Sequence, residues 1–244
     1  MSTQTKIFLS TMFAAGAGAV WCAMASWTCA DPLRFATYLA VSLLAAPVKV
    51  ALPGARGVTT GGFLVLMCAL VELSASEAVI VGVVSAIFQT YWRPATKPKL
   101  VHAAFNASNI AFARMSAGSS FATLMASDSV TFPAAVMIAA MIYFVVSTIP
   151  LAMVVGLTEG GSPFERWRKS ESWLAIHYLA AASMAMVVHY GSQHYGWPVI
   201  TLVLPLVFLY GKACHARLDK PERLPSMQLA PPRIREGASS ILRF

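Results

Sequence analysis

The sequence predicts an all-α fold, a polytopic bundle of transmembrane helices with about eight spans. Hydrophobic residues make up 57% of the chain and charged residues 11%, and the mean hydropathy is +0.65. Soluble globular domains contain about 25% charged residues, so the composition excludes that class. The apolar residues form long runs rather than short alternating segments, which favours spanning helices over the strands of a barrel.

Eight apolar segments define the expected spans. The first, at about 7–27, also matches a signal peptide, but its apolar length of about 20 residues favours a retained span. The others lie at about 35–50, 59–73, 76–92, 100–125, 132–157, 173–190 and 197–214. Spans three and four are only about 22 to 26 Å long against a hydrocarbon core of about 30 Å, so we expect their shared hinge below the membrane surface.

The connections between the spans carry most of the charges. Pro47 interrupts the end of the second span, and the loop 93–99 is basic and proline-rich. The segment 163–173 places two tryptophans among basic residues, which is typical of an interfacial helix or loop at the headgroups. We expect a transmembrane helical domain over 1–215, followed by a basic, proline-containing and disordered cytoplasmic tail over 216–244.

The distribution of basic residues predicts the orientation. Eight spans place both termini on one side, and cytoplasmic loops carry the excess of Lys and Arg. With the N-terminus inside, all 18 Lys and Arg residues except Arg34 and Arg114 fall in cytoplasmic loops, helix ends or the tail. This predicts a multi-pass, N-in and C-in protein of the inner (cytoplasmic) membrane. The net charge of +8 is then explained by contact with anionic headgroups, and nothing indicates nucleic-acid binding.

Arg114 lies within the fifth expected span, and charged side chains inside a membrane are rare and normally paired. Counting along the helices places it about 18 Å deep, close to Glu72 and Glu77 at about 20 and 22 Å. One interpretation is a buried ion pair that locks the hinge to the fifth span. The other is the polar floor of an outward-opening pocket that binds a small polar or anionic ligand.

The fifth span also carries a polar stripe at helical spacing, which should face the bundle interior. Its members are His102, Asn106, Asn109, Ser116 and Ser120. Asparagine in lipid needs a hydrogen-bond partner, so the stripe either contacts a ligand or bonds to neighbouring polar groups. Those neighbours would be Thr59, Thr60, Ser85 and Gln89. The candidate ligand-binding residues are Glu72, Glu77, Asn106, Asn109 and Arg114.

The first span presents two stripes of small residues at four-residue spacing. One contains Ala15, Ala19 and Ala23, and the other contains Ala14, Gly18, Cys22 and Ser26. Such stripes let helix backbones approach closely. They serve either packing within the chain or, for Ala15, Ala19 and Ala23, docking onto another membrane protein.

No complete catalytic motif and no metal-ligand spacing occur in the sequence, so we expect neither an enzyme nor a cofactor. His189 and His194 lie in the connection after span seven without a carboxylate or cysteine beside them, and an aromatic belt with polar tips describes that connection better than a metal site. His177 is expected to be a hydrogen-bonded interior residue. The four cysteines are scattered and are expected to be packing residues.

Two motifs resemble the membrane-embedded N-terminal region that precedes GGDEF or HD-GYP output domains in bacterial signalling proteins. They are the run Gly57-Val-Thr-Thr-Gly-Gly-Phe-Leu-Val-Leu66 and the run Leu100-Val-His-Ala-Ala-Phe-Asn-Ala-Ser-Asn-Ile-Ala111. Ser74-Ala-Ser76 stands where that family has a Gly-Pro hinge. The resemblance implies an integral-membrane sensory or ligand-binding module. Because we expect no output domain after Lys220, it would act through a partner protein.

Two alternatives compete with the sensory interpretation. The helix pattern and the alanine stripe of the first span are also similar to the substrate-binding S component of energy-coupling-factor transporters, in which such a stripe docks onto the coupling subunit. Eight spans rather than six depart from that family. The third alternative is a non-catalytic accessory or scaffold subunit of a larger membrane complex, without a ligand pocket.

The predicted topology can be tested by cysteine labelling. A cysteine introduced at Ser127 should react with an impermeant thiol reagent added from outside, whereas one at Ser170 should not, because the two loops lie on opposite sides of the membrane. Equal external labelling at both positions would overturn the eight-span, N-in arrangement.

Overall fold

The computed structural model describes residues 3–51, 58–60, 62–92, 98–127, 130–159, 161–170 and 172–218. Most of the expected tail, from residue 219 onward, and residues 93–97 of the basic loop therefore lie outside the described residues. Thr59 and Thr60 are described only as backbone, so their predicted bonds to the polar stripe are not addressed.

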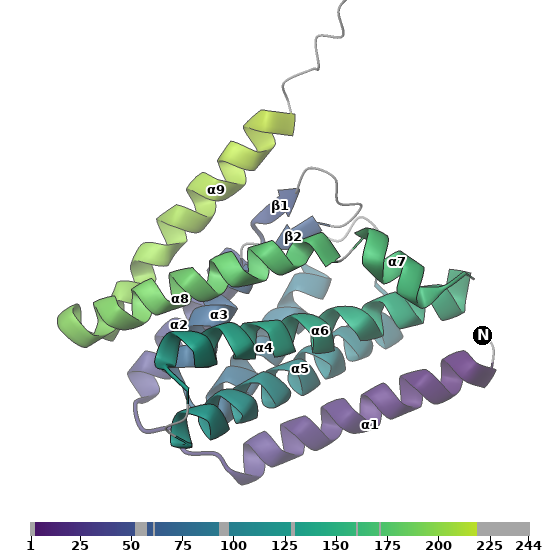
Figure 1. The fold of residues 1–244 in the computed structure, drawn as a ribbon, viewed down its shortest axis with the longest axis horizontal. Helices are drawn as coiled ribbons and strands as arrows, with labels where there is room; N and C mark the ends of the chain where they lie inside the picture. The colour runs from purple at the N-terminus through teal and green to yellow at the C-terminus, as the bar shows by residue number, and fades with distance from the viewer. Residues whose placement is uncertain are drawn as a thin grey trace, which may run out of the picture.

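The described chain folds into a helical bundle, which confirms the all-α prediction (Figure 1). The first half contains α1 (Thr3–Ala25), α2 (Pro32–Ala45), α3 (Gly62–Glu72), α4 (Ala75–Tyr91) and α5 (Leu100–Ala126). The second half contains α6 (Phe132–Glu159), α7 (Pro163–Ser170), α8 (Ala175–Tyr195) and α9 (Val203–Leu218). Two short 3₁₀ turns, η1 (Ser172–Leu174) and η2 (Trp197–Leu202), precede α8 and α9.

Local capping explains where several helices begin. Asp31 is the N-cap of α2 and accepts a hydrogen bond from the Arg34 backbone N–H at 3.0 Å, while Pro32 occupies the first turn, where its missing N–H costs nothing. Ser74 caps α4 and forms a reciprocal capping box with Glu77. The predicted hinge between spans three and four is therefore a helix stop followed at once by a capped helix start.

The bounds of two predicted spans are wrong at the connection between α2 and α3. Helices were expected over 35–50 and from 59, but α2 ends at Ala45 and α3 begins at Gly62. Between them lie two short antiparallel strands, β1 (Lys49–Ala51) and β2 (Val58–Thr60). Pro47 has no N–H to continue the helical ladder, and the valines and threonines of the two strands prefer extended backbone.

The last two predicted spans also differ in their bounds. Helix α8 continues to Tyr195, five residues beyond its expected end, and stops at Gly196, whose positive φ of 83° suits glycine. The expected eighth span is divided between η2 and α9. Residues 163–170 form the short helix α7, as one of the two predicted alternatives.

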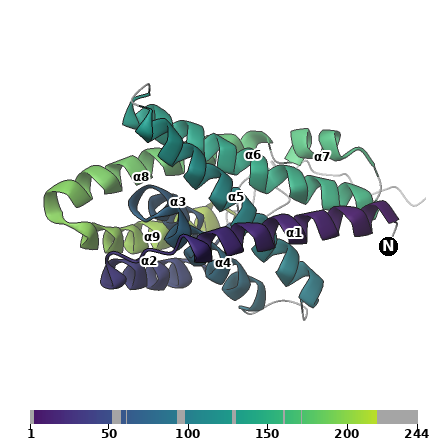
Figure 2. The ribbon, with the colours of Figure 1, turned by 90° about the horizontal axis from the view of Figure 1, so that it is seen from below.

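Helix α5 is the central element, because it packs against α1, α4 and α6 (Figures 1 and 2). The largest apolar core joins α2, α3, α4, α5, α6, α8 and the η2–α9 segment. Helix α3 is buried along almost its whole length, although it has only 11 residues. Alanines dominate the buried face of α5, which lets its neighbours approach closely.

Helix α1 packs along α4 and α5 through its small residues (Figure 2). Ala19 and Ala23 are buried with Val79 and Ala111, and a Cβ added at Gly16 would lie 2.4 Å from the Cα of Ser108. Ala15 is half-buried. In this structure the stripe of Ala15, Ala19 and Ala23 therefore packs within the chain.

By length and composition, two of the described helices can cross a membrane. They are Thr3–Ala25 and Phe132–Thr158, and several shorter apolar helices accompany them. The number of eight spans and the orientation stay predictions.

The contact between α1 and α5 yields a matched pair of substitutions. Gly16→Ala should destabilise the protein by about 1 to 3 kcal/mol, because the added methyl meets the backbone of Ser108. Gly18→Ala should be neutral or stabilising by about 0.5 to 1 kcal/mol, since nothing lies within 4 Å of the added Cβ and alanine favours the helix. Thermal unfolding in detergent measures both, and equal effects would contradict this packing.

Candidate functional site

Arg114 lies at the middle of α5 and is completely buried. Its Nη1 donates a hydrogen bond to the carbonyl of Leu66 on α3, and its guanidinium carbon lies 4.8 Å from the centroid of the Tyr143 ring on α6. Gly82 of α4 faces the same side chain. Arg114 therefore joins the three helices that surround the centre of α5.

The expected ion pair of Arg114 with Glu72 or Glu77 is wrong. Both carboxylates bind other partners, and no ion pair joins Arg114 to a carboxylate among the described residues. In place of a carboxylate, the guanidinium of Arg114 meets a carbonyl dipole and the face of an aromatic ring.

Glu72, the last residue of α3, is the centre of a polar cluster that we name the Glu72 cluster: Arg34, Glu72, His189 and Ser192. The carboxylate accepts hydrogen bonds from Nη2 of Arg34, from Nδ1 of His189 at 2.6 Å and from Oγ of Ser192 at 3.0 Å. Its side chain is 1% exposed. A carboxylate with three donors is well satisfied despite its burial.

The Glu72 cluster connects four helices at one end of the bundle. Arg34 comes from the first turn of α2, and His189 and Ser192 come from α8. The His189 ring also stacks on Phe132, the first residue of α6, with ring centroids 4.4 Å apart. The side chains of Arg34 and His189 are 31% and 24% exposed, so the surroundings can reach the cluster through these two residues.

Glu77 has a local role. Its Oε2 accepts hydrogen bonds from the backbone N–H and from Oγ of Ser74, at 2.9 and 2.8 Å. The next turn of the chain is tied to the end of α1, because Ser76 and Ser26 share a hydrogen bond of 2.9 Å. Desolvation and the nearby Glu77 carboxylate raise the pKa of the Cys29 thiol in the connection between α1 and α2.

The two candidate asparagines join α5 to different neighbours. Asn106 is exposed, and its Nδ2 lies 3.4 Å from Oγ1 of Thr90 on α4. Asn109 is buried and donates to the carbonyl of Ser147 on α6 at 2.8 Å, one turn before Pro150. These bonds follow the interhelical interpretation, although the partners differ from those expected.

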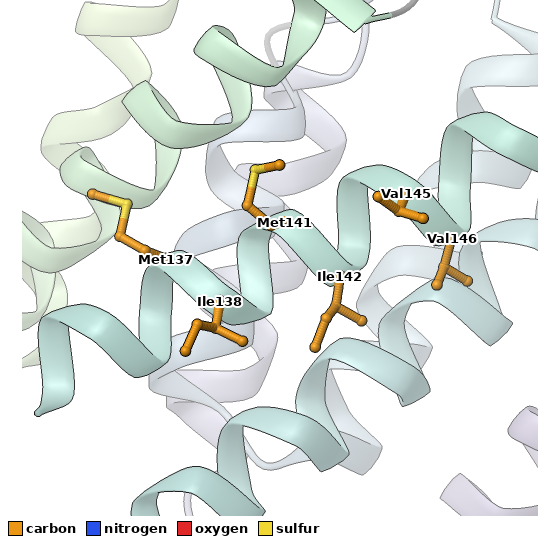
Figure 3. Close-up of a pocket in the computed structure, with 6 residues that line it drawn as sticks. All are labelled: Met137, Ile138, Met141, Ile142, Val145 and Val146. Atoms are coloured by element: carbon orange, nitrogen blue, oxygen red, sulfur yellow. The ribbon is translucent and has the colours of Figure 1, made fainter. Parts of the chain in front are cut away.

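The five candidate residues therefore do not converge on one pocket. Arg114 is central, the Glu72 cluster lies at one helix end, and the asparagines bind α4 and α6. A groove of about 450 Å³ on the outer face of α6 is lined only by apolar side chains (Figure 3). They are Met137, Ile138, Met141, Ile142, Val145 and Val146. Such a lining suits lipid chains better than a polar ligand.

Sequence reasoning missed Arg34, His189 and Ser192 as partners of Glu72. His189 and Ser192 are three residues apart and share one face of α8, but the helix was expected to end at residue 190. Arg34 was assigned to an outer loop, whereas the Asp31-Pro32 start places it in the first turn of α2. The Asp-Pro signal for that helix start was available in the sequence.

The comparison with protein-family models matches residues 31–215 to the family described as MASE9. This range is more than half of the chain, begins at the N-cap of α2 and does not include α1. No curated protein and no solved structure matches the chain.

The Glu72 cluster makes a stability prediction. Glu72→Gln should destabilise the bundle by about 1.5 to 3 kcal/mol, because it removes the buried carboxylate that accepts hydrogen bonds from Arg34, His189 and Ser192. The exposed Glu165 of α7 provides the matched control, and Glu165→Gln should change stability by less than about 0.5 kcal/mol.

A double-mutant cycle tests the partner assignment. Glu72→Gln with His189→Ala should be non-additive in unfolding free energy, whereas Glu72→Gln with Arg114→Leu should be additive. The reverse result would restore the ion pair expected from the sequence.

Proposed function

The chain belongs to the MASE9 family, and we propose that it is an integral-membrane sensory module that signals through a partner output protein or output domain. MASE families are membrane-associated sensory domains, so the coarser role follows from the family. Beyond that role, we propose that the module binds a ligand and signals to a partner.

The observation that carries the proposal is the family match over residues 31–215. It includes both sequence runs that resemble the regions before GGDEF or HD-GYP domains. It also includes Arg114 and the whole Glu72 cluster, so both of these charged sites belong to the matched part of the chain. We propose that the output partner carries a domain of the GGDEF or HD-GYP kind.

The transport alternative has less support. Its resemblance depended on the stripe of Ala15, Ala19 and Ala23 as a docking face, and the structure buries Ala19 and Ala23 against α4 and α5. The scaffold alternative differs from the sensory one in a measurable way. A scaffold binds its partner without changing the partner's activity, whereas a sensor changes that activity when its own conformation changes.

Copurification of the full chain from native membranes, followed by mass spectrometry, tests the proposal. We expect a stoichiometric partner with an output domain whose catalytic activity changes at least about two-fold in the Glu72→Gln variant, because this substitution loosens the bundle that the partner senses. Glu165→Gln should leave that activity unchanged.

The alternatives predict other results. Recovery of a coupling subunit with paired ATPases would favour uptake over sensing. A partner that binds equally well to the wild type and to Glu72→Gln, with unchanged output activity, would favour the scaffold and overturn the sensory proposal.

A further inference from the structure

Arg114 keeps one edge of its guanidinium without a hydrogen-bond acceptor. Nη1 donates to the Leu66 carbonyl, but Nε and Nη2 have no partner within the described part of the chain. The whole residue is 0% exposed, so water does not reach these groups from the surface. Burying a charged group whose N–H donors lack acceptors costs folding free energy. Such a group in a folded protein therefore needs a structural or functional reason.

The two unmatched nitrogens form a recognisable binding element. Nε and Nη2 occupy one side of the planar guanidinium, and their N–H bonds point in nearly the same direction. This paired edge fits the two oxygens of a carboxylate or phosphate group in a bidentate manner. The other nitrogen is bonded to Leu66 and one face packs on the Tyr143 ring, so the guanidinium is held with this edge still unused.

We propose that the Nε and Nη2 edge of Arg114 binds a small oxyanion, through a carboxylate or phosphate group, and that this binding switches the bundle between two arrangements. The inference rests on the proposed sensory function and deepens it by naming the chemical class of the ligand.

The neighbouring helix shows how binding couples to conformation. A Cβ added at Gly82 of α4 would lie 3.2 Å from Cγ and 3.4 Å from Nε of Arg114, so α4 closes over this side chain. In the proposed switch, an oxyanion reaches the edge when α4 and α5 separate at Gly82. The closed arrangement leaves both donors unmatched, and the occupied arrangement satisfies both. The ligand therefore distinguishes the two arrangements energetically, which is what a ligand-driven switch requires.

The Arg114 site differs from the Glu72 cluster because it has unused hydrogen-bonding capacity that a ligand can fill. The Glu72 carboxylate already accepts three hydrogen bonds, whereas two nitrogens of Arg114 lack an acceptor among the described residues. Glycine at position 82 brings the backbone of α4 close to the Arg114 side chain.

The test uses the full chain in nanodiscs with ¹⁵N-labelled arginine. Acetate and inorganic phosphate are each titrated against sodium chloride at constant ionic strength, and the Nε–H resonance of Arg114 and the unfolding temperature are followed. The resonance is assigned by its absence from Arg114→Lys. We expect a saturable shift of this resonance and a rise in unfolding temperature with at least one of the two anions.

Matched variants make the result specific. Arg114→Lys keeps the positive charge but lacks the paired edge, so its stabilisation by the anion should require a concentration about ten-fold or more higher. The exposed Arg168 of α7 is the control, and Arg168→Lys should respond like the wild type. If Arg114→Lys does not fold, Gly82→Ala replaces it, because its methyl group near Nε should weaken the resonance shift.

The lipid arm identifies the source of the oxyanion. A shift that appears on changing from phosphatidylcholine to phosphatidylglycerol nanodiscs, without added anion, assigns the site to a lipid phosphate, and a shift with acetate or phosphate assigns it to a free anion. If no arm moves the resonance, or if Arg114→Lys responds as the wild type does, the inference is overturned. A partner whose activity still changes in Glu72→Gln would then leave the sensory proposal intact.

Discussion

The main constraint on this bundle is that a charge buried among apolar helices must be compensated by groups within reach of its own side chain. Glu72 satisfies the constraint with three donors from two helices, and this cluster fixes the relative positions of α2, α3 and α8. Arg114 satisfies it only in part, with a carbonyl and an aromatic face. The buried carboxylate at one end of the bundle therefore has its hydrogen bonds satisfied, whereas the guanidinium at the centre keeps donors without an acceptor.

The small residues of the interior make this arrangement sterically feasible. Arg114 is among the largest side chains, yet it is completely buried, and Ala113 and Ala117 beside it on α5 are 0% exposed. Gly82 supplies space for it on α4, and Gly16 lets α1 approach Ser108 on another face of α5. Without side-chain bulk at these positions, backbone lies close to backbone, and the helices gain dispersion contacts with one another.

The sequence predicted the helical class and several helix bounds well, because proline, glycine and capping signals act locally. Helix α4 was expected from residue 76 and begins at Ala75, where the Ser74 capping box starts it. Polar partners were predicted poorly. The rise per residue gives the depth of a side chain, but the choice of partner depends on its direction around the helix axis. Glu72 points to α2 and α8, not to Arg114, and no depth count reveals that.

Helix α3 connects the two charged sites. The carbonyl that accepts from Arg114 belongs to Leu66, and Glu72 follows six residues later, about 9 Å along the same helix. The helix is short and almost fully buried, and it ends immediately before the Ser74 capping box that starts α4. A displacement of α3 changes the acceptor of Arg114 and the geometry around Glu72 together. One helix therefore links Arg114 directly to the carboxylate that holds the partly exposed side chains of Arg34 and His189.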